Sequence, residues 1–255
     1  MMRTLIQTTF TILILFAGMS SYAQFDTKQG RIIADENPGG IIEAYELEKS
    51  DVAEGSFFIN DYWLVGSALL YDGRAFSNNP LKYNLRDDYL VILDNNEVSR
   101  VLRFDKIKNF EWFDIELKKN AFFINCFEFD SEGTPLIGFA EVLVEGEIDL
   151  LLYRKLNLVK GNYSITHDAG QLNDEYKIDE LHYLNIENKL YLGQKKKTIL
   201  PLLENKRTEV EKYVKVNHLR YNERADLIKI ITYYTMKFFS ILSLKIFVYK
   251  IFYTI

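Results

Sequence analysis

The stretch LIGFAEVLVEGEIDLLLYRKLNL, residues 136–158, decides the fold class of this chain. Two apolar runs, Leu136 to Val144 and Glu147 to Leu158, flank the pair Glu145-Gly146. Runs of this length on either side of a glycine turn are typical of an antiparallel hairpin. We therefore predict a hairpin with long arms in the middle of the chain.

Short apolar runs separated by turn residues also precede this hairpin, from Phe57 onward. The chain contains 18 Phe and 17 Tyr but only 4 Pro, a composition that suits half-buried pleated surfaces. Asp72-Gly73 predicts a two-residue type I′ turn, because glycine adopts positive φ at no steric cost. The other expected strands are Trp63–Tyr71, Leu81–Asn84, Tyr89–Leu93, Val98–Phe104, Asn109–Ile115 and Ala121–Phe129, followed by a hairpin of Glu175–Leu184 and Lys189–Leu192.

Seven to nine strands are therefore expected between residues 57 and 160, spaced about ten residues apart. This spacing indicates an antiparallel sandwich, an open barrel or a curved meander. The fold class that we predict is mainly β with a small C-terminal α-helical segment, and α+β overall.

The apolar period changes to that of a helix after residue 197. Thr208 and Glu211 have the spacing of a capping box, and Asn222 is suited to cap a second helix. We expect two short helices, over residues 208–216 and 223–235.

The N-terminus has the features of an export signal. Arg3 precedes an apolar stretch, and the small residues Ser21 and Ala23 suit cleavage after Ala23. We expect an exported protein of the periplasm, the cell surface or the secreted fraction; an uncleaved anchor is the alternative. The expected division of the chain is a signal peptide at 1–23, an extended lead-in at 24–55, an antiparallel β domain at 56–160, a loop and β-hairpin at 161–196, C-terminal helices at 197–235 and an atypical apolar tail at 236–255.

The tail from Met236 to Ile255 has no Gly, Ala, Asp, Glu, Asn or Gln. Lys245 and Lys250 argue against a membrane-spanning segment, because a charge near the bilayer centre costs about 2.5–3.5 kcal/mol. Three interpretations remain open: a product of a shifted or extended reading frame, a packed extension of the helices, or a membrane contact.

Charge is unevenly distributed along the chain. Residues 24–192 contain 17 Lys and Arg against 31 Asp and Glu, whereas residues 193–255 contain 13 against 5. We expect the basic end to fold back on the acidic body, with contact to an anionic surface as the alternative. A net-negative exported chain is not expected to bind nucleic acid.

Few residues have the pattern of a reactive site. His167 lies beside Asp168, and His182 and His218 are isolated, so no metal cluster is expected. Cys126 lies in the predicted strand Ala121–Phe129, on the face of Phe122 and Ile124, and is expected to be a small buried apolar residue rather than a nucleophile.

Two further patterns were considered as sites. The neighbouring acids Asp87-Asp88 are expected to be solvated turn residues, although paired acids can perform acid–base chemistry. Trp63 and Trp112 are expected to belong to the core or to cross-strand pairs, with a sugar-stacking surface as the alternative. We predict no catalytic, cofactor-binding or metal-binding residue and no cofactor.

Several segments together resemble a family of uncharacterised exported proteins of unknown function that is common in the Bacteroidetes. These segments are Leu81–Leu85, Glu141–Gly146, Leu151–Lys155, Val210–Val214 and Tyr233-Tyr234. The resemblance covers residues 60–235 and implies export, but no catalytic residue. Members of the family end soon after the position of Tyr234, so the tail from Met236 departs from it.

We hypothesise a non-enzymatic exported envelope protein that acts as a binding or interaction module. The expected partner is an envelope protein or a glycan, with possible membrane contact through Met236–Ile255. The alternatives are an envelope hydrolase that uses carboxylates, favoured if two buried acids share a cleft, and an outer-membrane-associated β protein.

Overall fold

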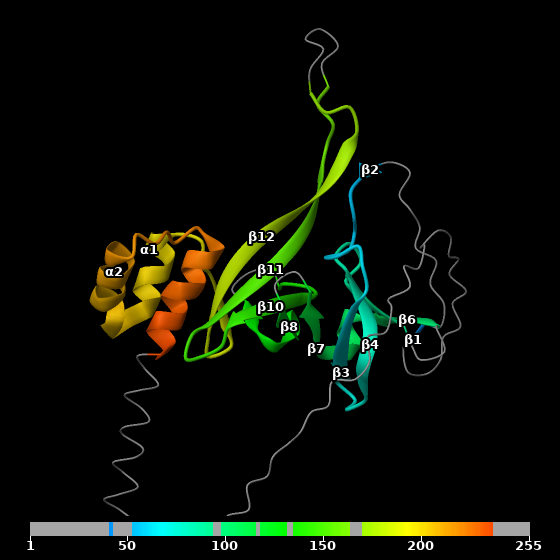
Figure 1. Cartoon of the computed structure of the whole chain (residues 1–255), viewed down its shortest axis with the longest axis horizontal. Helices are drawn as coiled ribbons and strands as arrows, with labels where there is room; N and C mark the ends of the chain where they lie inside the picture. The colour runs from blue at the N-terminus through cyan, green and yellow to red at the C-terminus, as the bar shows by residue number, and fades with distance from the viewer. Residues whose placement is uncertain are drawn as a thin grey trace, which may run out of the picture.

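The structure is a computed structural model that describes residues 41–42, 53–93, 98–115, 118–131, 135–163 and 170–236. In this part of the chain, ten main strands form one open antiparallel sheet, and three short helices follow at the C-terminal end (Figure 1). The predicted fold class, mainly β with a small C-terminal helical segment, is confirmed.

Each predicted strand has a counterpart in the structure, although the strand predicted from Leu81 begins six residues earlier, at Ala75. Six precede residue 126: β3 (Leu64–Leu70), β4 (Ala75–Asn84), β5 (Tyr89–Leu93), β6 (Ser99–Arg103), β7 (Ile107–Asp114) and β8 (Lys119–Asn125). Four follow: β10 (Phe139–Val144), β11 (Asp149–Val159), β12 (Asp174–Ile186) and β13 (Lys189–Leu192). Three two-residue strands complete the sheet: β1 (Ile41–Ile42), β2 (Ala53–Glu54) and β9 (Asp130–Ser131).

Main strands that are adjacent in the chain are also adjacent in the sheet, except that β7 returns to pair with β3. Only the short 3-10 turn η1 (Phe104–Lys106) joins β6 to β7. In a flat sheet, four strand spacings would separate β6 from β7 by about 19 Å, whereas the four residue steps from Arg103 to Ile107 span about 14 Å at most. The sheet must therefore curl. Of the three predicted arrangements, the curved meander describes it.

The curled part of the sheet encloses an aromatic core. The Phe110 and Phe123 rings stack 4.5 Å apart, and Trp112 and Phe139 pack against Phe110 at 5.1 and 4.9 Å. Tyr83 meets Phe139 edge to face at 5.3 Å. Strands β3–β8 and the first residue of β10 thus bury the aromatic side chains that the composition predicted for a pleated surface.

Two hairpin turns differ from the turn predicted at Asp72-Gly73. Asp72-Gly73 does not form a two-residue turn: the Leu70 N–H donates to the Arg74 carbonyl, which leaves a three-residue loop in which Gly73 has φ +86°. This is a turn followed by a glycine bulge. The two-residue turn lies instead between β12 and β13, where Glu187 and Asn188 have φ of +51° and +66°.

The strand predicted over Ala121–Phe129 ends early, at Asn125. The Asn125 amide nitrogen donates to the Phe104 and Ile107 carbonyls, both at 2.7 Å, and its oxygen accepts from the Phe127 N–H. These bonds turn the chain into the 3-10 turn η2 (Cys126–Glu128). Cys126 is therefore not a strand residue, and its predicted alignment with Phe122 and Ile124 is wrong.

The C-terminal helices are α1 (Lys196–Ile199), which continues into the 3-10 helix η3 (Leu200–Lys206), α2 (Arg207–Val216), and a helix over residues 224–236. The last two agree with the predicted 208–216 and 223–235. The predicted capping box is wrong, because the helix starts one residue before Thr208 and Lys206 is the N-cap. The predicted Asn222 cap is wrong by one residue: the next helix starts at Arg224, and the Glu223 carbonyl accepts its first backbone bond, from Leu227. The Asp226 carboxylate in its first turn accepts from the Arg220 N–H.

Strands β10–β12 have one face that packs against both the C-terminal helices and the curled core, which cover different parts of it. We call this face of the sheet the helix face. Leu150 and Leu184 on this face pack with Leu203, Val210 and Ile230 of the helices. On the opposite face, Cys126, Ala140, Leu151 and Leu190 form a small third cluster.

The predicted signal peptide at 1–23, most of the lead-in at 24–55 and the tail beyond Met236 lie outside the described residues. Within the described ranges, no helix combines the length and the apolar character that a bilayer crossing requires.

Candidate functional site

The most prominent feature of the molecule is a two-stranded arm. Strands β11 and β12 pair from Asp149–Asn185 to Val159–Glu175, but β10 pairs with β11 only as far as Tyr153. Beyond that point the two strands continue as a twisted ribbon that rises above the rest of the sheet (Figure 1). We define the arm as residues 154–163 and 170–181; β2 pairs with its far end at Asp174 and Glu175.

Strand β11 presents an open edge along the arm. Backbone groups of successive residues in a strand alternate between its two sides. The Gly193 N–H donates to the His182 carbonyl at 2.8 Å, so even-numbered residues of β12 face β13 and odd-numbered ones face β11. The register pairs odd with odd. Leu156 and Leu158 consequently direct N–H and C=O away from β12, along an edge that no strand in the described ranges occupies.

The two faces of the arm differ in polarity, as in a strand that lies on a core. The apolar face carries Leu156, Leu158, Tyr176 and Ile178. The opposite, mostly polar face carries Lys155, Asn157, Lys177 and Asp179, with Val159 at the end of the strand. Leu156 packs against the curled core. Leu158 and Ile178 are 42% and 37% exposed, so the outer half of the apolar face is only partly covered.

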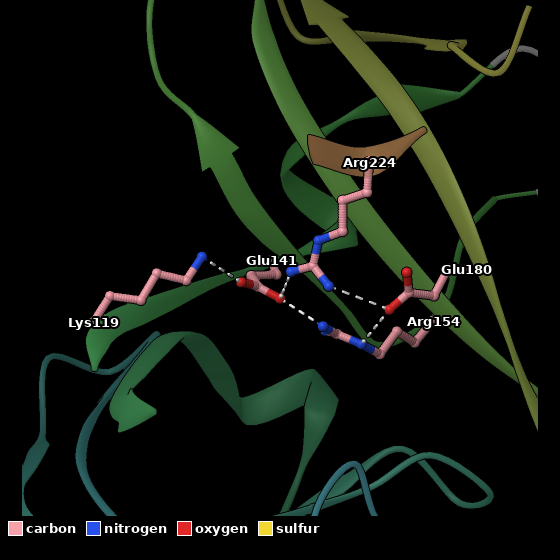
Figure 2. Close-up of polar contacts among 5 residues, drawn as sticks. All are labelled: Lys119, Glu141, Arg154, Glu180 and Arg224. Atoms are coloured by element: carbon pink, nitrogen blue, oxygen red, sulfur yellow. Dashed lines mark hydrogen bonds and ion pairs between the residues drawn. The ribbon is translucent and has the colours of Figure 1, made fainter. Parts of the chain in front are cut away.

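Five charged residues meet at the base of the arm, where β11 leaves β10 (Figure 2). Glu141 of β10 has a side chain that is only 3% exposed, and it accepts a hydrogen bond from Arg154 of β11 at 2.7 Å. Lys119 of β8 and Arg224 of the last helix lie 3.6 and 3.5 Å from the same carboxylate. Glu180 of β12 pairs with Arg154 at 3.5 Å and with Arg224 at 3.4 Å. We call this set the ion-pair network.

The sheet register explains why the network forms. Arg154 and Glu180 are direct cross-strand partners, and Glu141 lies opposite Leu152 in the next row. All are on the helix face, between the curled core and the helical core. Arg224 is the first residue of the last helix and approaches Glu141 and Glu180 from above the sheet (Figure 2). The network therefore ties four strands and one helix together at the base of the arm.

His182 lies beside the network, on the β12 position directly opposite Leu152. It is 8% exposed, and its Nε2 has no hydrogen-bond partner. Burial lowers the pKa of His182; Glu180 opposes this effect, while Arg224 and Arg154 add to it. The imidazole is therefore neutral at pH 7.

The other residues singled out from the sequence do not gather at this site. His167 lies outside the described residues, and His218 has φ +53° after α2. Cys126 is buried, and burial raises the pKa of its thiol to about 12, so it stays protonated. No group of three metal-ligating side chains occurs in the described ranges.

The acids Asp87 and Asp88 have separate environments. Asp87 pairs with Arg86 at 2.9 Å in an exposed turn. Asp88 accepts a hydrogen bond from the Tyr83 hydroxyl at 2.7 Å, and burial raises the pKa of the Asp88 carboxyl. The prediction of solvated turn residues thus holds for Asp87 and fails for Asp88, which packs against the core beside Tyr83.

The two tryptophans do not form one surface. Trp112 is buried in the curled core, whereas Trp63 lies in a small cluster with Phe58. The Lys82 ammonium lies 5.2 Å from the Trp63 ring centroid and donates to the Asp61 carbonyl at 2.6 Å. The core assignment of Trp112 is confirmed.

Sequence reasoning missed the ion-pair network. One signal was available in the sequence. Arg154 and Glu180 are each two residues from a residue of the helix face, Leu152 and His182, and so lie on the same face, and Glu141 is a lone charge in an apolar run. A charge at an inward-facing position requires a partner. The identity of that partner depended on strand register and on the docking of the last helix.

Comparison with known proteins gives no relative from which a role could be transferred: no family model, no curated protein and no solved structure matches this chain.

Proposed function

We propose that this chain is an exported, non-enzymatic interaction module of the cell envelope, and that it binds its partner by adding a strand to the open edge of the arm. The observation that carries the proposal is the direction of the Leu156 and Leu158 backbone groups, which face away from β12. An extended peptide beside this edge would complete the missing ladder.

The side chains of the arm support the same mode of binding. A bound strand would extend the apolar face beside Leu158 and Ile178, where partial exposure leaves apolar surface to be buried. The ion-pair network at the base restrains the arm relative to the sheet and the last helix. The arm therefore loses less conformational entropy when it binds a partner.

Export is supported by the sequence of the first 23 residues and by the resemblance to exported proteins.

The hydrolase alternative calls for two buried acids in one cleft with raised pKa values. Burial raises the pKa of the Asp88 carboxyl, but its neighbour Asp87 pairs with Arg86 in an exposed turn, so these two acids do not form a buried pair and the hydrolase alternative has less support.

The proposal is tested by panning the purified protein against a displayed library of random short peptides. Proline at Leu158 removes an edge N–H that has no strand partner among the described residues, so Leu158→Pro is compatible with the described fold. Leu158→Ala removes the side chain but keeps the N–H donor. Selected peptides should bind Leu158→Pro about tenfold or more weakly than Leu158→Ala.

Unfolding curves establish that both variants are folded. The proposal is refuted if peptides bind folded Leu158→Pro and Leu158→Ala equally well, or if the wild-type protein is monomeric and retains no peptide of extended character.

A further inference from the structure

We infer that the strand added to the open edge is β11 of a second copy of this chain, in antiparallel orientation about a two-fold axis at Asn157. The inference rests on the proposed function, because it uses the same edge and names its occupant. It follows from strand parity, from the identity of the side chains and from the length of β11 that lies beyond β10.

Parity restricts the possible registers. Only even-numbered residues of β11 direct N–H and C=O to the open edge, so even residues must pair with even ones in the partner strand. An axis at Asn157 meets this condition and pairs Leu156 with Leu158 of the second copy. Asn157 then lies opposite its own equivalent, at a position without backbone hydrogen bonds.

The free length of the edge favours the same axis. The part of β11 without a β10 partner begins after Tyr153 and ends at Val159. An axis at Asn157 pairs residues 155–159 with their equivalents and places Arg154 opposite Lys160, the residue that follows the strand. Moving the axis to residue 156 would bring Val159 of the second copy opposite Tyr153, which Ala140 of β10 already occupies.

Side-chain chemistry agrees with this register. Leu156 beside Leu158 of the second copy makes one continuous apolar face across four strands, with Ile178 on the outer strand of each copy. Moving the axis to residue 158 would instead place Leu156 opposite Lys160. Each end of the paired stretch brings together Arg154 and Lys160, and each cation has its own carboxylate at 2.7 and 2.6 Å.

A pair of single-cysteine variants tests the register. Across the axis, Asn157→Cys would bring two cysteines to about 4.5 Å between Cα atoms, within the range of a disulfide. Lys155→Cys has a similar position on the polar face. In the dimer, residue 155 of one copy would be displaced from residue 155 of the other by four residues along the strand, or about 13 Å. Cys126 is buried with a raised pKa and does not compete.

Under mild oxidation, Asn157→Cys should give a disulfide-linked dimer at least tenfold faster than Lys155→Cys. Sedimentation of the wild-type protein should show a concentration-dependent dimer that Leu158→Pro abolishes. Equal linking of the two cysteine variants, or a wild-type protein that remains monomeric while Asn157→Cys fails to link, overturns the inference.

The peptide experiment separates this inference from the proposed function. Selected peptides that require the Leu158 N–H, together with a monomeric wild-type protein, would refute the second copy as occupant while leaving strand addition supported. A lack of both dimer and peptide binding would refute the two together.

Discussion

Replacing Glu141 by glutamine removes the central charge of the ion-pair network with little change in volume. The carboxylate is 3% exposed, and Arg154, which donates to it at 2.7 Å, has a side chain that is 13% exposed. Removing one partner of a buried ion pair costs about 3–5 kcal/mol, because the remaining charge stays buried without compensation. Glutamine keeps one oxygen for Arg154, so we expect a loss at the lower end, about 3 kcal/mol.

The matched control is Lys119→Met. Lys119 lies 3.6 Å from the same carboxylate, but its side chain is 42% exposed, so its loss should cost about 0.2–1 kcal/mol. Urea unfolding followed by tryptophan fluorescence measures both variants, since Trp112 is buried in the core. In thermal unfolding, the Glu141→Gln loss corresponds to about 6–12 °C for a domain of this size.

The reasoning about the network is wrong if Glu141→Gln costs no more than Lys119→Met. A second check is the double variant Glu141→Gln with Arg224→Gln. Because the two residues belong to one network, their effects should deviate from additivity by about 0.5–3 kcal/mol. Simple addition would show that Arg224 does not contribute to the environment of Glu141.

Three further predictions concern stability. The pKa of His182 is lowered in the folded protein, so the unfolding free energy of the wild-type protein should fall as pH decreases below about 6.5. In urea unfolding measured from pH 8 to 5, His182→Met should reduce the dependence of the unfolding free energy on pH. An unchanged dependence contradicts this prediction. Glu187→Asn should stabilise by about 0.5–1 kcal/mol, seen as a higher melting temperature, since asparagine tolerates φ +51°. Gly66→Ala should cost about 3 kcal/mol by urea unfolding, because its Cβ would strike the Glu111 carbonyl oxygen and come within 2.9 Å of Trp112 Cα; a cost below 1 kcal/mol would contradict this.

The local pattern of the sequence predicted the strands well. Runs such as Tyr89–Leu93 and Asn109–Ile115 are apolar, are bounded by turn residues and coincide closely with β5 and β7. Turns were harder, because the loop length between paired residues sets the turn type. Asp72-Gly73 has the right residues for a two-residue turn, but pairing closes at Leu70 and Arg74 instead.

Non-local geometry was not predictable from local pattern. The return of β7 to β3 depends on how far the sheet curls, and the end of β8 at Asn125 depends on carbonyls of a distant turn. The ion-pair network required the register of four strands and the position of the last helix. Only its inward-facing charges, Glu141, Arg154 and Glu180, were visible in the sequence.

Arg224 comes from the last helix that the structure describes, so the surroundings of Glu141 depend on the final part of this region to be synthesised. A chain that has produced only its strands can pair Glu141 with Arg154 and Lys119, but Glu180 lacks its second cation. The sheet would reach its full stability only after the helices dock. If the chain is exported, as we propose, this order would delay tight folding until the C-terminal region has also crossed the membrane.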